Sequence, residues 1–147
     1  MRILFIIGIF VISCATNNGF KSQVLTSSKG ELIFINSYNY GITGDNQLTV
    51  ISKDKDKLKY NSDTSDAVSG LNPFIYSFKN DTLTLIFNDT ITYVIKEEFE
   101  TINVVYKKIS NSQYMDFVQR AVRNDGFHQV PDFRENNIID IPKPPLK

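Results

Sequence analysis

The segment FIYSFKNDTLTLIFNDTITYVIKEEFETINVVYKKI, residues 74–109, carries the clearest structural pattern in the chain. Large apolar side chains alternate with other residues in four parts of it, at 74–78, 83–87, 91–95 and 102–106. A period of two is typical of β-strands, because successive side chains of a strand point to opposite faces. The segment therefore predicts four consecutive strands joined as an antiparallel meander.

The turns between these strands determine which side chains share a face. Asn80-Asp81 predicts a two-residue hairpin turn, since Asn tolerates positive φ, and this turn sets Phe78 opposite Leu83. A three-residue loop is expected at 88–90, because a two-residue turn would send the next strand's apolar residues to the wrong side. The apolar surface that results consists of Phe74, Tyr76, Phe78, Leu83, Leu85, Phe87, Ile91, Tyr93, Ile95, Ile102, Val104 and Tyr106.

Strands are also expected nearer the N-terminus, at 22–27, 31–36 and 47–52. The first two predict a hairpin, because Gly30 supplies the permissive backbone that a tight reversal needs. With Lys29-Gly30 as the turn, Leu25 faces Phe34.

One helix is expected after the sheet, at about 111–124. Ser110 or Ser112 can cap its start, and Ser110 with Gln113 has the spacing of a capping box, while Gly126 can end it. We expect this helix to pack on the apolar face of the sheet, because that face must be shielded from water. The alternative is that the helix lies on a membrane surface. Its apolar stripe consists of Tyr114, Phe117, Val118, Ala121 and Val122.

These patterns predict a mainly β fold class (β+α) with one C-terminal helix, in a single domain at 22–126. Residues 127–147, after this domain, are expected to form an extended tail. The four prolines of this segment lack the amide donor and disfavour helix in the residues before them. This tail can pack along the domain or serve as a proline-rich docking peptide.

The N-terminus has the pattern of a targeting segment. Arg2 precedes the ten-residue apolar run 3–12, which as a helix covers about 15 Å, half of the about 30 Å hydrocarbon core. The sequence VISC at 11–14 resembles the lipobox of bacterial lipoprotein signal peptides, whose Cys is lipidated and becomes the new N-terminus. The resemblance implies removal of 1–13 and a lipid on Cys14. The alternatives are an uncleaved anchor or a chance Cys after an apolar run.

Composition agrees with an exported lipoprotein. Cys14 is the only cysteine, so no disulfide forms within the chain, and lipidation would account for the lone thiol. Residues 14–21 form a polar tether, and no Asp or Glu occurs between Cys14 and Glu31. An acidic signal after the Cys directs some lipoproteins to the cell surface. Its absence favours a lipid-anchored position in the cell envelope, at the periplasm-facing side of the outer membrane.

The sequence offers little for catalysis, metals or nucleic acid. His128 is the only histidine, so no catalytic His–Cys pair or zinc site is predicted. The carboxylates Glu97, Glu98 and Glu100 are interpreted as a solubilising turn, and the alternating charges at 53–57 as a solvated turn rather than a metal loop. With no phosphate loop and no basic stripe either, we expect no enzyme, no cofactor and no nucleic-acid partner.

Two further resemblances concern modification and relatives. The triplets around Thr82 and Thr90 resemble the Asp-Thr-aliphatic motif that some Bacteroidota O-glycosylate on exported proteins; the alternative is turn chemistry. The hairpin sequence at 27–31, the glycines of 41–44 and the strand 48–51 resemble small secreted bacterial domains of unknown function. That resemblance implies a β-rich envelope domain and no active-site residues.

The function that follows is a non-enzymatic envelope lipoprotein, acting as a binding or structural module with an envelope protein as partner. Its candidate ligand surface is the loop with Tyr38, Tyr40, Gly41 and Gly44, because aromatics flanked by glycines combine contact area with backbone adaptability. The alternative is that these tyrosines pack over a sheet edge. The alternative function is an inhibitor or immunity-type protein that blocks a hydrolase or toxin.

Overall fold

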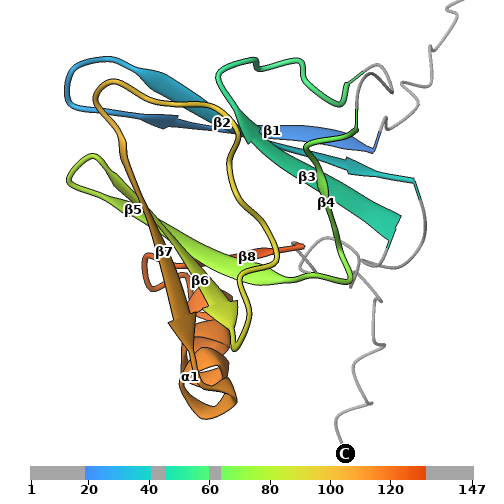
Figure 1. The fold of residues 1–147 in the computed structure, drawn as a ribbon, viewed down its shortest axis with the longest axis vertical. Helices are drawn as coiled ribbons and strands as arrows, with labels where there is room; N and C mark the ends of the chain where they lie inside the picture. Colours follow the sequence, from blue (N-terminus) through green and yellow to red (C-terminus); the bar gives the residue numbers. More distant parts are fainter. Residues whose placement is uncertain (1–18, 41–45, 60–63, 132–147) are drawn as a thin grey trace, which may run out of the picture.

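The computed structural model of the chain describes residues 19–40, 46–59 and 64–131. These residues form two stacked sheets and one helix (Figure 1). The elements are β1 (Phe20–Thr26), β2 (Leu32–Asn39), β3 (Gln47–Ser52), β4 (Val68–Ser69), β5 (Phe74–Lys79), β6 (Thr82–Asn88), β7 (Asn103–Ile109), α1 (Asn111–Val122) and β8 (His128–Val130). Sheet A has the order β1-β2-β3-β4, and sheet B has the order β7-β6-β5-β8. The predicted mainly β fold with one C-terminal helix is confirmed.

The β5–β6 hairpin forms as the sequence predicts. Asn80 and Asp81 have φ values of 49° and 56°, which a two-residue turn of this kind requires. Phe78 pairs with Leu83 and Tyr76 with Leu85. The hairpin register and its turn are therefore confirmed.

The predicted third strand of the meander is wrong. Residues 91–95 have no strand structure, and Ile91, expected in the core, is 43% exposed. The chain crosses instead along sheet A and returns as β7, which pairs with β6 in parallel (Figure 1). Parallel neighbours need a crossover of about a dozen residues, and 89–102 supply it. Sheet B is therefore mixed rather than a meander.

The predicted apolar surface exists despite the changed topology. Eleven of its twelve residues lie in or against one core cluster, with Ile91 the exception. The crossover still turns Tyr93 and Ile95 inward, so the side chains of 91–95 reach the core without a strand. Sheet A supplies the opposite wall through Ile33, Ile35 and Ile51. The main core is therefore the interior of a β-sandwich.

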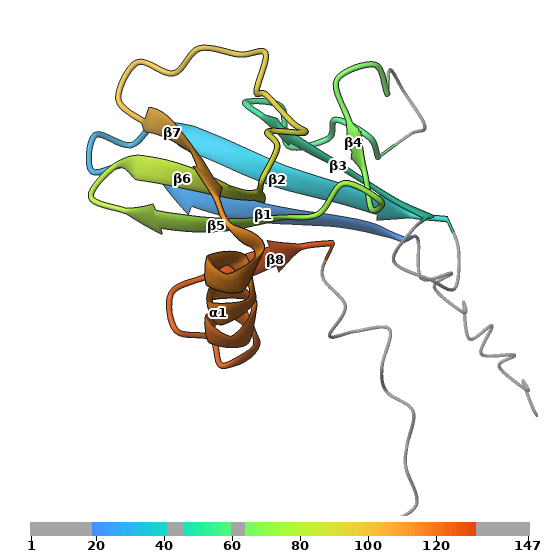
Figure 2. The ribbon, with the colours of Figure 1, turned by 60° about the horizontal axis from the view of Figure 1, so that its bottom comes forward.

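The helix covers the other face of sheet B, so the prediction that it lids the main apolar surface is wrong. Figure 1 shows α1 on the far side of sheet B from sheet A, and Figure 2 shows it next to β8. There Tyr114 packs with Ile75 and Ile86, which point away from the sandwich interior. Both faces of β5 and β6 are apolar at these positions, so each face needs a cover. Val122, expected on the buried stripe, is exposed, while Ser110 and Gln113 form the predicted capping box.

The N-terminal hairpin has a longer turn than predicted. Ser27 N–H donates to the Glu31 carbonyl oxygen, and Gly30 has a φ of 85° in the three-residue loop between them. Leu25 therefore pairs with Ile33, and the predicted pairing with Phe34 is wrong by one residue. The observed register brings Leu25 and Ile33 to the same apolar core.

The ends of the domain extend slightly beyond the expected bounds. β1 begins at Phe20, within the predicted tether, and β8 lies within the predicted tail, where it pairs with β5. β3 occupies the residues that the sequence predicts. Cys14 and the tail from 132 onward lie outside the described residues.

Candidate functional site

The predicted aromatic surface lies at one end of sheet A. Tyr38 and Tyr40 stack with ring centroids 6.4 Å apart and planes inclined by 24°. Tyr38 is half-buried between the paired strands, facing Phe20 on β1 and Leu48 on β3, whereas Tyr40 is 58% exposed. Gly41 and Gly44, the other predicted members, lie outside the described residues.

A ladder of backbone hydrogen bonds joins four segments at this end. Asn39 N–H donates to the Gly19 carbonyl oxygen at 2.7 Å, and Gly70 N–H donates to the Gln47 carbonyl oxygen at 2.8 Å. A Cβ on Gly19 would lie 1.9 Å from the carbonyl oxygen of Asn39, so only glycine fits there. We call the described residues 19–21, 38–40, 46–48 and 69–73 the tether end, because the chain from Cys14 enters the domain here.

The tether end presents apolar side chains and little charge. Leu71, next to Gly70, is 71% exposed and joins Tyr40 among the most exposed apolar residues of the described chain. Lys21 carries the only formal side-chain charge among the residues that define this end. The sequence analysis missed Leu71, although an apolar residue in the turn-forming context Gly70 to Pro73 is a recognisable signal of exposure.

The opposite end of the sandwich is polar and tightly cross-linked. We call residues 27–31, 79–82 and 99–101 the hairpin end. Ser28 N–H donates to Asp81 Oδ1 at 2.6 Å, and the Ser28 hydroxyl donates to Asp81 Oδ2. These hydrogen bonds, the hydroxyl's first, hold the pKa of Asp81 below its usual value. The tips of the two hairpins, one from each sheet, are thereby fixed to each other.

Glu31 attaches the crossover to the same end. Its carboxylate accepts hydrogen bonds from Glu100 N–H at 2.9 Å and from Thr101 N–H at 2.6 Å, and Lys53 Nζ lies 3.4 Å away. Partial removal from water raises the pKa of Glu31, but the hydrogen bonds outweigh this effect and lower it to about 2.

Replacement Glu31→Gln is expected to lower stability at neutral pH and to flatten the acid branch of the stability curve. The folded-state pKa of about 2 lies below the ordinary 4.5, so the stabilisation is complete above about 4.5 and is lost as pH falls toward 2. Urea denaturation at a series of pH values measures both effects. The exposed Glu98→Gln is the matched control, and equal curves for the two variants would contradict the prediction.

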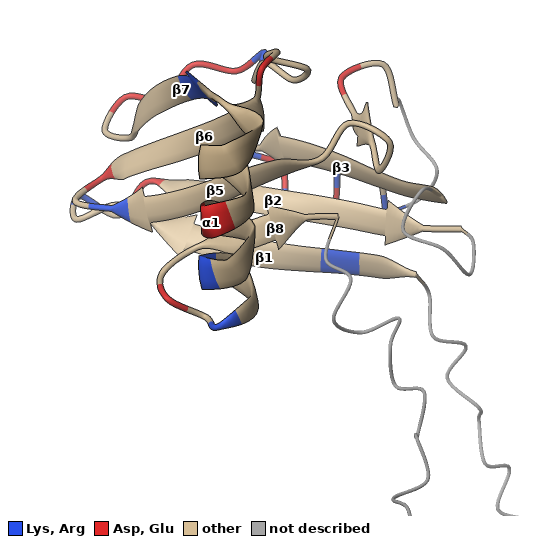
Figure 3. Cartoon of the chain, turned by 90° about the horizontal axis from the view of Figure 1, so that it is seen from below, with Lys and Arg blue, Asp and Glu red and all other residues tan. Residues whose placement is uncertain are grey.

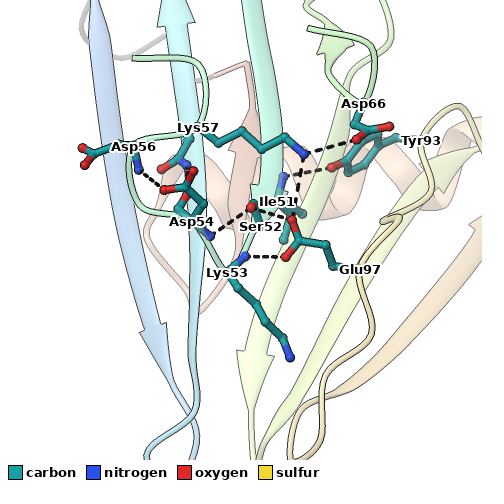
Figure 4. A network of polar contacts seen from close by, with 10 residues as sticks. Ile51, Ser52, Lys53, Asp54, Asp56, Lys57, Asp66, Tyr93 and Glu97 are labelled. Carbon is teal, nitrogen blue, oxygen red and sulfur yellow. Dashed lines mark hydrogen bonds and ion pairs between the residues drawn. The ribbon is translucent and has the colours of Figure 1, made fainter. Parts of the chain in front are cut away.

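The acidic crossover and the lysine-rich turn meet in one polar network (Figure 4). Glu97 accepts hydrogen bonds from the Ser52 hydroxyl at 2.6 Å and from Lys53 N–H at 2.7 Å. Lys57 Nζ lies 3.2 Å from Asp66 and 3.9 Å from Glu97. The interpretation of both segments as merely solvated turns is wrong for Glu97 and Lys57, because they join the crossover to the turn after β3.

The remaining predicted chemistry is dispersed over the fold. His128 lies in β8 and stacks on Tyr76, with ring centroids 4.9 Å apart. The Thr82 hydroxyl donates to the Asn80 carbonyl oxygen at 3.3 Å within the hairpin turn, and Thr90 is exposed at the start of the crossover. Across residues 19–40, 46–59 and 64–131, no group of three or more potential ligands is placed to hold a metal ion.

Comparison with known proteins adds no family to this description. No protein-family model, no curated protein and no solved structure matches the chain. Within the described part of the chain, no helix is both long enough and apolar enough to cross a bilayer.

Proposed function

We propose that the chain is a lipoprotein of the cell envelope, anchored through Cys14, whose β-sandwich acts as a non-enzymatic binding or structural module. The lipobox-like sequence at 11–14 carries this proposal. Attachment of several acyl chains gives durable membrane binding, whereas a single chain binds only marginally. The absence of acidic residues between Cys14 and Glu31 supports the periplasmic face of the outer membrane.

The engagement of the carboxylates supports a binding role over a catalytic one. Glu31 and Asp81 fix the hairpin end, and Glu97 fixes the crossover, each through hydrogen bonds to backbone N–H groups. A catalytic acid or base must be free to exchange a proton with a substrate. These three carboxylates are occupied in holding loops, which suits a preorganised binding surface.

Replacement Cys14→Ser tests the anchor. In a diderm host, the wild-type protein is expected to lose residues 1–13, gain the mass of the lipid and enter the detergent phase. The variant is expected to stay unlipidated and enter the aqueous phase. Ser13→Ala is the matched control, because it keeps a small residue before the Cys and should still be lipidated. Wild-type protein that retains Met1 and partitions like the variant would overturn the proposal.

An intact-mass measurement on the native protein tests glycosylation at Thr82 and Thr90. The exposed Thr90 is the more accessible of the two hydroxyls. Mass beyond the lipid that disappears in Thr90→Ala would support modification. A mass accounted for by protein and lipid alone would exclude it.

The rigid hairpin end favours a second candidate function, an inhibitor or immunity-type protein. Ser28 and Asp81 fix two loop tips in one orientation, and preorganised loops lose less entropy on binding. This function requires a tight, stoichiometric hydrolase or toxin partner. Capture from envelope extracts with wild-type protein and with Lys29→Glu tests this function. Lys29 is exposed at the hairpin tip, so reversing its charge should reduce capture of a partner that binds there.

A further inference from the structure

We propose that the tether end lies against the bilayer, with Tyr40, Leu71 and Lys21 in contact with the lipid headgroup region, while the hairpin end points away from the membrane. This inference rests on the proposed lipid anchor at Cys14. It assigns a partner, the surface of a bilayer, to the aromatic residues predicted as a ligand surface.

The first argument is the length of chain between the lipid and the fold. Cys14 precedes Gly19 by five residues, and five extended residues reach about 18 Å at most. Gly19 is fixed to Asn39 by the backbone hydrogen bond, and Phe20 pairs with Tyr38. The position of the anchor therefore holds the aromatic pair within a short distance of the headgroups.

The second argument is the chemistry of the exposed side chains. Tyr40 and Leu71 are 58% and 71% exposed, and the bond between Gly70 and Gln47 brings the turn with Leu71 to the same end. Tyrosine is favoured at membrane interfaces, because its ring is apolar and its hydroxyl is polar. Lys21 adds a positive charge, which anionic headgroups attract.

The third argument is the contrast between the two ends. The residues that define the tether end include no Asp or Glu, whereas those of the hairpin end include five formal charges. The five are Lys29, Glu31, Lys79, Asp81 and Glu100. Figure 3 likewise shows no acidic colouring where β1 begins. β1 has seven residues and separates the two ends by about 23 Å. The formal charges sum to +1 at the tether end and to −1 at the hairpin end, so anionic headgroups favour contact with the tether end.

Single tryptophan reporters test the orientation directly, since the chain contains no tryptophan. Tyr40→Trp and Leu71→Trp place the reporter at the tether end, and Lys29→Trp places it at the hairpin end. All three positions are exposed, so the fold should tolerate the change, and urea denaturation verifies this. Each lipidated mature variant, residues 14–147, is reconstituted in vesicles of phosphatidylethanolamine and phosphatidylglycerol with brominated acyl chains, and its fluorescence is measured.

The expected result is a blue shift and a loss of fluorescence at positions 40 and 71, with solvent-like, unquenched emission at position 29. The same reporters in the Cys14→Ser background supply the unanchored reference. Protein that floats with the vesicles but shows no quenching at 40 and 71, or more quenching at 29, would overturn the orientation while leaving the anchor intact. Wild-type protein that neither carries lipid nor floats would overturn both the anchor and the orientation.

Discussion

Replacement Phe74→Ala is expected to lower the free energy of unfolding by about 3–5 kcal/mol, a large share of the about 5–15 kcal/mol typical of a domain. Phe74 is fully buried at the centre of the sandwich. Its ring lies 5.6 Å from that of Phe87 in sheet B and 5.6 Å from that of Tyr93 in the crossover. Truncation removes apolar contacts with both partners and leaves a cavity that neither sheet can fill by itself.

Urea denaturation followed by circular dichroism measures this loss. Leu71→Ala is the control, because it also truncates an apolar residue in the segment that leads into β5, but one that is 71% exposed. The control should change the midpoint little. A Phe74→Ala midpoint close to that of the control would show that the sandwich core does not depend on the Phe74 ring.

Alternation in the sequence identifies the buried face of sheet B but not the partner of each strand. A turn such as Asn80-Asp81 defines its register locally, because the φ values it needs are encoded in two residues. The pairing of β7 with β6 depends on a crossover of irregular backbone, for which no local signal exists. The residues 91–95 alternate because Tyr93 and Ile95 face the core, and a buried irregular segment can alternate as a strand does.

Which element packs on each face of sheet B also depends on tertiary structure. The sequence predicts α1 and its capping box from local spacing, and both are confirmed. Which face α1 covers depends on the competition between it and sheet A for the two apolar faces of β5 and β6. Sheet A is the larger cover and takes the face with Phe74 and Phe87, while α1 takes Ile75 and Ile86.

The candidate site was predictable in part. Tyr38 and Tyr40 stand out in the sequence, and the structure places them at the end where the chain from Cys14 enters. Leu71 joins them through the contact between Gly70 and Gln47, which are far apart in sequence. The roles of Glu31 and Glu97 likewise depend on partners many residues away, so composition alone suggests only a charged surface.

Replacement Tyr93→Phe is expected to lower the free energy of unfolding by about 1–3 kcal/mol, although it removes a single oxygen atom. The Tyr93 hydroxyl accepts the Ile51 N–H at 2.8 Å, and both residues are buried. Among the described residues, β4 pairs with β3 at Leu48 and Thr49 and not at Ile51, so Tyr93 takes the place of a strand partner on the side of Ile51 away from β2. Burial raises the pKa of Tyr93 to about 12, so the hydroxyl stays protonated at neutral pH.

The loss of stability in Tyr93→Phe comes from the buried Ile51 N–H, which is left unpaired. It does not come from lost packing, because the ring at position 93 can keep its stack on Phe74. Tyr40→Phe is the matched control, since it removes the same hydroxyl from an exposed ring. Hydrogen exchange shows whether the Ile51 N–H has lost its partner. The Ile51 amide should lose protection in Tyr93→Phe and keep it in Tyr40→Phe. Unchanged protection and stability in Tyr93→Phe would mean that β3 does not need the crossover as its partner. A loss would identify the crossover as the element that completes sheet A, although it forms no strand of its own.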